Sequence, residues 1–89
     1  MISTKITIIN KLGLHARAAA KLVGVTAKFS AKIRAGVNGR MIDAKSIMSV
    51  MMLAAAKGSE LDLEFDGADE QSAHDAVVAL INNRFDEAE

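Results

Sequence analysis

The sequence predicts an α+β fold, an open-faced two-layer sandwich in which three helices cover one face of a four-stranded antiparallel sheet. Four stretches alternate between apolar and polar residues, as half-buried strands do. Three further stretches repeat apolar residues at helical spacing, which gives the order β-α-β-β-α-β-α. Strands with a single apolar face need helices on that face, so two layers are expected. The 89 residues suit one domain, residues 1–89, with one core.

The first half of the chain supplies a strand, a helix and a hairpin. Residues 2–8 alternate, with Ile2, Thr4, Ile6 and Ile8 on one side. A loop follows, and residues 16 to about 28 form a helix that packs on the sheet, although Gly24 lowers its intrinsic propensity by ~1 kcal/mol. Residues 29–35 alternate again. Asn38-Gly39 is the strongest short hairpin signal and predicts an antiparallel return over residues 40–44.

The second half repeats the pattern of helix, strand and helix. Ser46 is a favoured N-cap, so residues 47 to about 55 are predicted to be a helix that Lys57-Gly58 closes. Residues 60–66 alternate with unusual regularity. Asp69 is expected to cap a last helix, and residues 86–89 to form a frayed acidic tail. The core stripe of this last helix is Ala73, Ala76, Val77, Leu80 and Ile81.

Composition narrows the classes of function. Eleven basic and eleven acidic residues cancel, which gives no electrostatic case for binding nucleic acid or an anionic membrane. Cysteine is absent, so disulfides and thiolate metal sites are excluded. His74 has only Glu70 as a potential co-ligand on its helix, and a solvent-facing histidine is expected rather than a metal ligand. We expect no metal, no cofactor and, without a signal peptide or membrane-spanning run, a cytoplasmic location.

The most informative residue is His15, which lies where the first strand gives way to the first helix. The first turn of a helix has free backbone N–H groups and the positive end of the helix dipole, and it therefore attracts anions. An imidazole there can act as a nucleophile toward a phosphoryl group through its unprotonated ring nitrogen. Arg17, two residues later, can hold phosphate oxygens in its planar fork. Local chemistry alone leaves open that His15 is an ordinary surface or capping residue.

Two motifs favour the phosphoryl acceptor over the ordinary surface or capping residue, because they resemble those of a known family. The segment Gly13-Leu14-His15-Ala16-Arg17 resembles the phosphorylation site of the HPr family, the histidine-containing phosphocarriers of the bacterial phosphoenolpyruvate-dependent phosphotransferase system. The segment 45–53, which begins Lys45-Ser46, resembles the regulatory-serine segment of the same family. The resemblance implies that enzyme I phosphorylates His15, expected on Nδ1, and that the group passes to an EIIA-type protein. It implies a carrier and protein substrate more than an independent enzyme.

The resemblance also assigns a regulatory and a docking role. Ser46 is the residue that a dedicated HPr kinase/phosphorylase modifies in some members, although an N-cap needs no second role. On a helical wheel Val50 and Leu53 share one side with Ser49, Met52 and Ala56, whereas Ile47, Met48 and Met51 share the other. A short helix cannot bury both sides, so the second side should stay exposed and, with Ala20, dock partners beside His15. A monomer is expected.

Two alternatives belong to other classes of function. A regulatory binding protein of the same fold would act through Ser46 alone, but it would not need His15. An adaptor for an unrelated partner would leave His15 inert to enzyme I. The sequence does not distinguish a sugar-uptake branch from a nitrogen-linked one.

Overall fold

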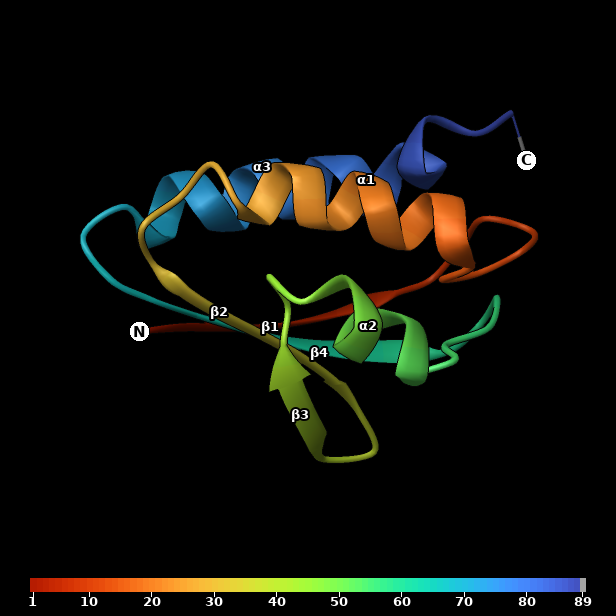
Figure 1. Cartoon of the computed structure of the whole chain (residues 1–89), viewed down its shortest axis with the longest axis horizontal. Helices are drawn as coiled ribbons and strands as arrows, with labels where there is room; N and C mark the ends of the chain where they lie inside the picture. Colours follow the sequence, from red (N-terminus) through yellow and green to blue (C-terminus); the bar gives the residue numbers. More distant parts are fainter. Residues whose placement is uncertain (89) are drawn as a thin grey trace.

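The four strands form one antiparallel sheet in the order β1-β4-β2-β3, with helices over one face (Figure 1). The computed structural model describes residues 1–88. This architecture confirms the predicted open-faced α+β sandwich and its element order. The elements are β1 (Ile2–Thr7), α1 (Ala16–Thr26), β2 (Lys32–Val37), β3 (Arg40–Asp43), α2 (Ile47–Met52), β4 (Glu60–Asp66), α3 (Glu70–Asn82) and a final 3-10 turn, η1 (Arg84–Asp86).

Strand β4 is the centre of the sheet because both β1 and β2 pair with it. Its apolar residues Leu61, Leu63 and Phe65 are buried, and the residues between them point away from the helices. Phe65 lies opposite Ile2 on one side and Ile33 on the other, so the apolar faces of three strands are in register. The alternation in the sequence therefore produces one continuous core face.

The opposite face of the sheet is charged. Lys5 on β1 lies 3.4 Å from Glu60 and 3.8 Å from Asp62 on β4. Arg34 on β2 lies 3.7 Å from Glu64. Cross-strand pairs of opposite charge suit a face that no helix covers.

Helices α1 and α3 contact each other and lie over the core face (Figure 1). α1 contributes the buried residues Ala18, Ala19, Leu22 and Thr26. The small alanines let the helix approach closely. α3 buries Ala73, Val77 and Ile81, three of the five residues predicted for its core stripe, and the other two, Ala76 and Leu80, are half-buried. The shorter α2 contacts α1 and β3 and is anchored by Val50, which is fully buried.

Several predicted boundaries were wrong by a few residues. α1 ends at Thr26, and β2 begins at Lys32 rather than at residue 29. α2 ends at Met52, because the chain turns at Ala54, whose φ is +51°. Gly58 does not close this helix; its N–H donates to the carbonyl of Ile8 at 2.8 Å and ties the segment to the end of β1.

Two predicted roles on the last helix also need correction. Asp69 does precede the helix, but its carboxylate makes no cap bond; it accepts the N–H groups of Ser30 and Ala31, each at 2.8 Å. His74 is not a solvent-facing residue. Its ring donates or accepts at Thr4 Oγ1, 2.9 Å away, and it meets the ring of Phe65 edge-on at 5.4 Å. This histidine joins helix to sheet.

Across residues 1–88, none of the helices has both the length and the apolar character that crossing a membrane would require.

Candidate functional site

The loop between β1 and α1 is held against the segment that follows α2. Gly13 has a φ of +66°, and a Cβ at this position would lie 2.4 Å from the carbonyl oxygen of Ala55. Only glycine combines this backbone conformation with so close an approach. The next residue, Leu14, donates its N–H to the same Ala55 oxygen at 2.8 Å. The residue after that, His15, therefore starts from a fixed backbone position.

His15 occupies the N-cap position of α1, as the sequence predicted. Its backbone is extended, and its carbonyl accepts the N–H of Ala19 at 2.8 Å, the first hydrogen bond of the helix. The imidazole makes no capping bond, so the N–H groups of residues 16–18 keep their anion-binding potential. The side chain is about a quarter exposed, at 26%. The imidazole and the free N–H groups of the helix therefore lie together at the N-terminus of α1, in a partly exposed position.

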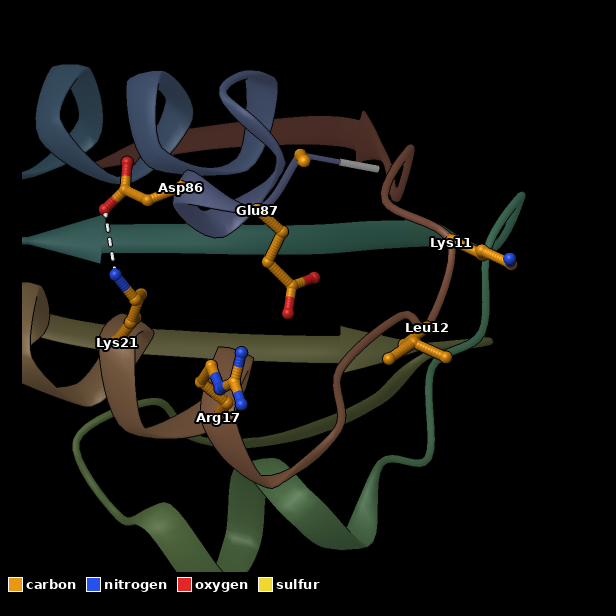
Figure 2. Close-up of a pocket in the computed structure, with 7 residues that line it drawn as sticks. Lys11, Leu12, Arg17, Lys21, Asp86 and Glu87 are labelled. Carbon is orange, nitrogen blue, oxygen red and sulfur yellow. Dashed lines mark hydrogen bonds and ion pairs between the residues drawn. The ribbon is translucent and has the colours of Figure 1, made fainter.

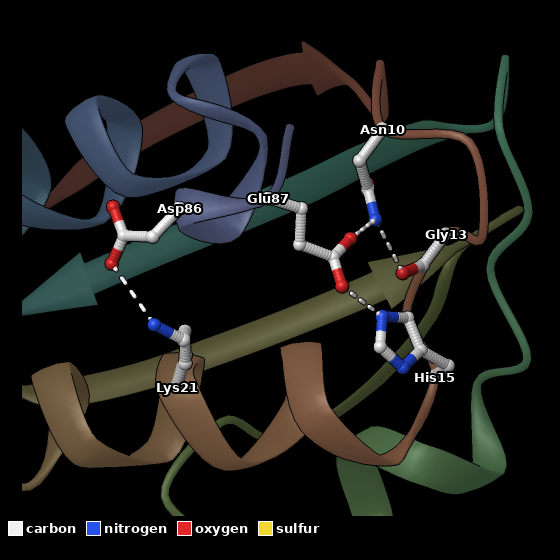
Figure 3. Close-up of polar contacts among 6 residues, drawn as sticks. All are labelled: Asn10, Gly13, His15, Lys21, Asp86 and Glu87. Carbon is white, nitrogen blue, oxygen red and sulfur yellow. Dashed lines mark hydrogen bonds and ion pairs between the residues drawn. The ribbon is translucent and has the colours of Figure 1, made fainter. Parts of the chain in front are cut away.

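The C-terminal segment reaches this site. The prediction that residues 86–89 form a frayed tail was wrong for Asp86 and Glu87, which both make side-chain hydrogen bonds, whereas Glu89 lies outside the described residues. Glu87 Oε2 lies 2.5 Å from His15 Nε2, and Glu87 Oε1 accepts Asn10 Nδ2 at 2.8 Å (Figure 3). Asn10 Nδ2 also donates to the carbonyl of Gly13 at 2.9 Å. One carboxylate therefore joins the end of the chain to the loop and to the histidine.

The backbone before Glu87 has an uncommon conformation. Arg84, Phe85 and Asp86 all have positive φ, between +52° and +62°. The left-handed region disfavours residues with a Cβ. Burial of Phe85, which is fully enclosed, and the hydrogen bond from Asn83 Nδ2 to Asp86 at 2.8 Å hold this turn. The turn directs Glu87 back over the start of α1.

The surroundings of Glu87 favour its charged form. The Asn10 amide that donates to the carboxylate is the main cause of a lowered pKa, and the hydrogen bond from His15 and the positive charge of Arg17 act in the same direction. Partial burial opposes them. The net effect lowers the pKa of Glu87 from its ordinary value of 4.5. Glu87 is therefore a carboxylate at neutral pH and can only accept hydrogen bonds.

A surface pocket of about 490 Å³ lies beside this cluster, between α1 and the C-terminal segment (Figure 2). Three cationic side chains, Lys11, Arg17 and Lys21, line it. Lys21 pairs with Asp86 at 3.4 Å. Arg17 is exposed on the first turn of α1, two residues from His15. Asp86 and Glu87 line the same pocket, so its cationic side chains outnumber its carboxylates by three to two. The exposed guanidinium of Arg17 is the group that suits a transient phosphoryl group best.

The predicted regulatory and docking residues lie on or near α2. Ser46 is its N-cap, and its Oγ accepts the N–H of Ser49 at 3.3 Å. Ile47, Met48 and Met51 are exposed by 40, 67 and 41%. Met52 is also exposed, by 65%, so the prediction that it lies on the core side with Val50 was wrong. Ala56, placed on that side too, is exposed beyond the end of the helix, and Ala20 is exposed on α1.

Residues 1–88 contain no group of three or more metal-ligating side chains of the His, Cys, Asp or Glu type. The sequence did not point to Asn10 and Glu87 as hydrogen-bonding residues of this site, or to Lys11 and Lys21 as lining residues of the pocket beside it. Asn10 and the lysines flank the motif, so proximity in sequence was the available signal. Glu87 is 72 residues from His15, and no local pattern points to it.

Comparison with known proteins gives a consistent result. Residues 2–83 match the family described as PTS HPr component phosphorylation site. The chain is 58% identical to the phosphocarrier protein HPr of Cupriavidus necator over the whole of both chains, and 58% identical to that of Pseudomonas aeruginosa, again with full coverage. The crystal structure of an HPr from Thermoanaerobacter tengcongensis superposes with a TM-score of 0.96 at 40% identity and full coverage of both chains.

Proposed function

Because the chain belongs to the HPr family, the phosphocarriers of the phosphotransferase system, we propose that enzyme I phosphorylates it on His15 and that it passes the group to an EIIA-type protein. The observation that carries the proposal is the geometry of His15. The imidazole is partly exposed, lies beside free helix N–H groups, and is hydrogen-bonded to Glu87, which lines the same pocket as Arg17. These are the features that a phosphoryl acceptor requires.

The transfer balances without an added acid or base. The lone pair of the unprotonated ring nitrogen attacks phosphorus, and the bond from phosphorus to the donor atom breaks with its electron pair staying on the donor. The ring keeps the proton on its other nitrogen, so the adduct is an imidazolium that carries a phosphoryl dianion. The step is largely one of positioning and charge stabilisation.

Arg17 and the first turn of α1 supply that stabilisation in the proposal. A guanidinium binds two phosphate oxygens with parallel N–H bonds, which a lysine cannot do. The N–H groups of residues 16–18 add the positive end of the helix dipole. His15 is first the nucleophile and then, when the group moves on, the leaving group.

Partner binding is assigned to the exposed apolar surface of α2 together with Ala20. Ile47, Met48 and Met51 form a flexible apolar surface that can adapt to several partners in turn. An HPr kinase/phosphorylase acting on Ser46 would add regulation. We propose that the carrier works in the cytoplasm and that it is a monomer. Light scattering after size-exclusion chromatography measures its molar mass and so tests the monomeric state.

The decisive experiment incubates the protein with enzyme I and phosphoenolpyruvate labelled on phosphorus. Acid-labile, base-stable label should accumulate on the wild type in a one-to-one ratio. His15→Ala should take up none while keeping its circular dichroism spectrum, because the side chain is outside the hydrophobic core and makes no capping bond to α1. Equal uptake by His15→Ala would refute the proposal.

A further inference from the structure

We propose that Glu87 is a positioning residue for His15: its carboxylate accepts the Nε2–H, fixes this tautomer of the ring, and so leaves Nδ1 as the nitrogen with a free lone pair. The inference rests on the proposed phosphoryl transfer to His15. It assigns a chemical role to the C-terminal segment, which crosses the site at close range.

The direction of the hydrogen bond follows from the two groups that share it. A carboxylate accepts and cannot donate, so the ring must donate from Nε2 to Glu87 Oε2. A neutral imidazole carries a single N–H, and once it lies on Nε2 the other nitrogen is unprotonated. In Figure 3 that second nitrogen faces away from Glu87 and toward the start of α1.

Asn10 fixes the carboxylate in turn. Its Nδ2 donates to two groups that only accept, Gly13 O at 2.9 Å and Glu87 Oε1 at 2.8 Å. The amide cannot be reversed, because its oxygen would then face two other oxygens. Asn10 is fully buried, and its Oδ1 has no hydrogen-bond partner among residues 1–88. A buried oxygen without a partner costs stability, and here the same amide holds Glu87 beside the ring.

The same contact suits the phosphorylated state. Transfer leaves the ring as an imidazolium with its proton on Nε2. A carboxylate that already accepts this proton stabilises the positive charge as it develops, without rearrangement. The aspartate of a Ser-His-Asp triad acts in the same way: it orients the histidine, stabilises the imidazolium, and does not itself become protonated.

Glu87→Gln gives a specific test because Asn10 dictates how the new amide is oriented. The amide oxygen takes the hydrogen bond from Asn10 Nδ2, so the amide nitrogen faces His15 Nε2 and donates to it. The ring is then protonated on Nδ1, the nitrogen that must attack. Glu87→Ala only releases the ring to a mixture of tautomers. Asp66→Asn, at the end of β4 remote from this loop, removes one exposed carboxylate as a matched control.

Nitrogen-15 NMR of the neutral ring reads the tautomer directly, without any partner protein. The wild type and Asp66→Asn should carry the proton on Nε2, Glu87→Gln on Nδ1, and Glu87→Ala on both. Single-turnover phosphorylation by phosphorylated enzyme I should be fastest for the wild type and Asp66→Asn, slower for Glu87→Ala, and slowest for Glu87→Gln. Glu87→Gln should be slower than Glu87→Ala, and slower than the wild type by about 10- to 100-fold, the loss typical of residues that orient metal-binding histidines in the same way.

A purely structural role predicts the reverse order, because glutamine preserves the shape of the segment better than alanine does. A proton on Nε2 in Glu87→Gln, or a rate at or above that of Glu87→Ala, would therefore overturn the role of Glu87. Phosphorylation of the wild type would still stand in that case. Absence of phosphorylation in every protein, including the wild type, would instead refute the proposed function and the role of Glu87 within it.

Discussion

Arg17 shows how far a single residue determines the chemistry of the site. Its side chain is exposed beside His15, so substitution should leave the fold intact. Arg17→Lys retains the positive charge but loses the planar fork that binds two phosphate oxygens at once. We expect slower phosphorylation in single-turnover measurements with an unchanged circular dichroism spectrum. Identical rates for Arg17→Lys and the wild type would show that Arg17 has no part in the transfer.

Asp69 is a residue whose contribution should depend on pH. Its carboxylate accepts the N–H of Ser30, the largest cause of its lowered pKa, and the N–H of Ala31. A carboxyl whose pKa is lowered by folding stabilises the protein above the unfolded-state pKa, ordinarily 3.8, and that stabilisation is lost as the pH falls through the lower folded-state value.

The substitution Asp69→Asn should therefore lower the melting temperature at neutral pH by more than it does in acid. Thermal unfolding of both proteins across the acid range measures this difference. Asp66→Asn, whose carboxylate is exposed on β4, serves as the control for loss of one charge. A difference between Asp69→Asn and the wild type that stays constant with pH would contradict the assigned hydrogen bonds.

Helix α2 has two faces that differ in their exposure to solvent. Met48 is 67% exposed and Val50 is fully buried. Met48→Asp should change the free energy of unfolding by no more than about 0.5 kcal/mol, as surface substitutions do. The same change should weaken binding to enzyme I, since it puts a charge on an apolar contact surface. Val50→Ala should show the converse behaviour and lose about 2 kcal/mol of stability.

Titration calorimetry with enzyme I and denaturant unfolding measure these two quantities. A large loss of stability in Met48→Asp would mean that this residue belongs to the core. Full affinity in Met48→Asp would remove the α2 surface from the docking site.

A substitution at Ser46, the N-cap of α2, tests whether a charge at this position affects phosphorylation of His15. Ser46→Asp keeps an acceptor for the N–H of Ser49 and adds a charge that the helix dipole favours, by ~0.3–1 kcal/mol. The added charge lies on the surface where the partners of His15 are proposed to bind, so phosphorylation should slow. Added salt should restore part of the rate, because it screens surface charges.

Ser46→Ala separates capping from charge, because it should lose about 1 kcal/mol of stability without any salt-sensitive repulsion. Melting curves and phosphorylation rates at several salt concentrations provide the comparison. Equal rates for Ser46→Asp and the wild type at every salt concentration would reduce Ser46 to a helix cap.

The sequence predicted those features of the helices and strands that depend on neighbouring residues, and it missed those that depend on contacts between distant residues. The strands and the caps at His15 and Ser46 could be predicted, because period-two alternation and capping are properties of neighbouring residues. The end of α2 could not, because a turn at Ala54 and a contact from Gly58 to β1 end the helix three residues before the predicted boundary. Met52 was misplaced for a different reason: it lies four residues after Met48 and only two after Val50, so regular helical geometry already puts it on the exposed side with Met48.

In the whole molecule, the fold brings the loop between β1 and α1 and the C-terminal segment into one site. The motif around His15 predicts the phosphoryl acceptor, and the comparisons confirm the family to which that motif pointed. Glu87 could not be found from the sequence, since its position depends on the packing of Phe85 and on a left-handed turn that no residue pattern announces. His74 was misjudged likewise, because Thr4, its partner on β1, is 70 residues away.

The proposed function depends on the chain carrying a phosphoryl group on one nitrogen of His15. Phosphorus-31 NMR of the protein, labelled with nitrogen-15 in histidine and phosphorylated by enzyme I, detects that bond. We predict a single phosphorus signal that is coupled to Nδ1 of His15 and disappears on acidification. A signal coupled to no histidine nitrogen, or one that persists in acid as a phosphoserine signal does, would contradict it.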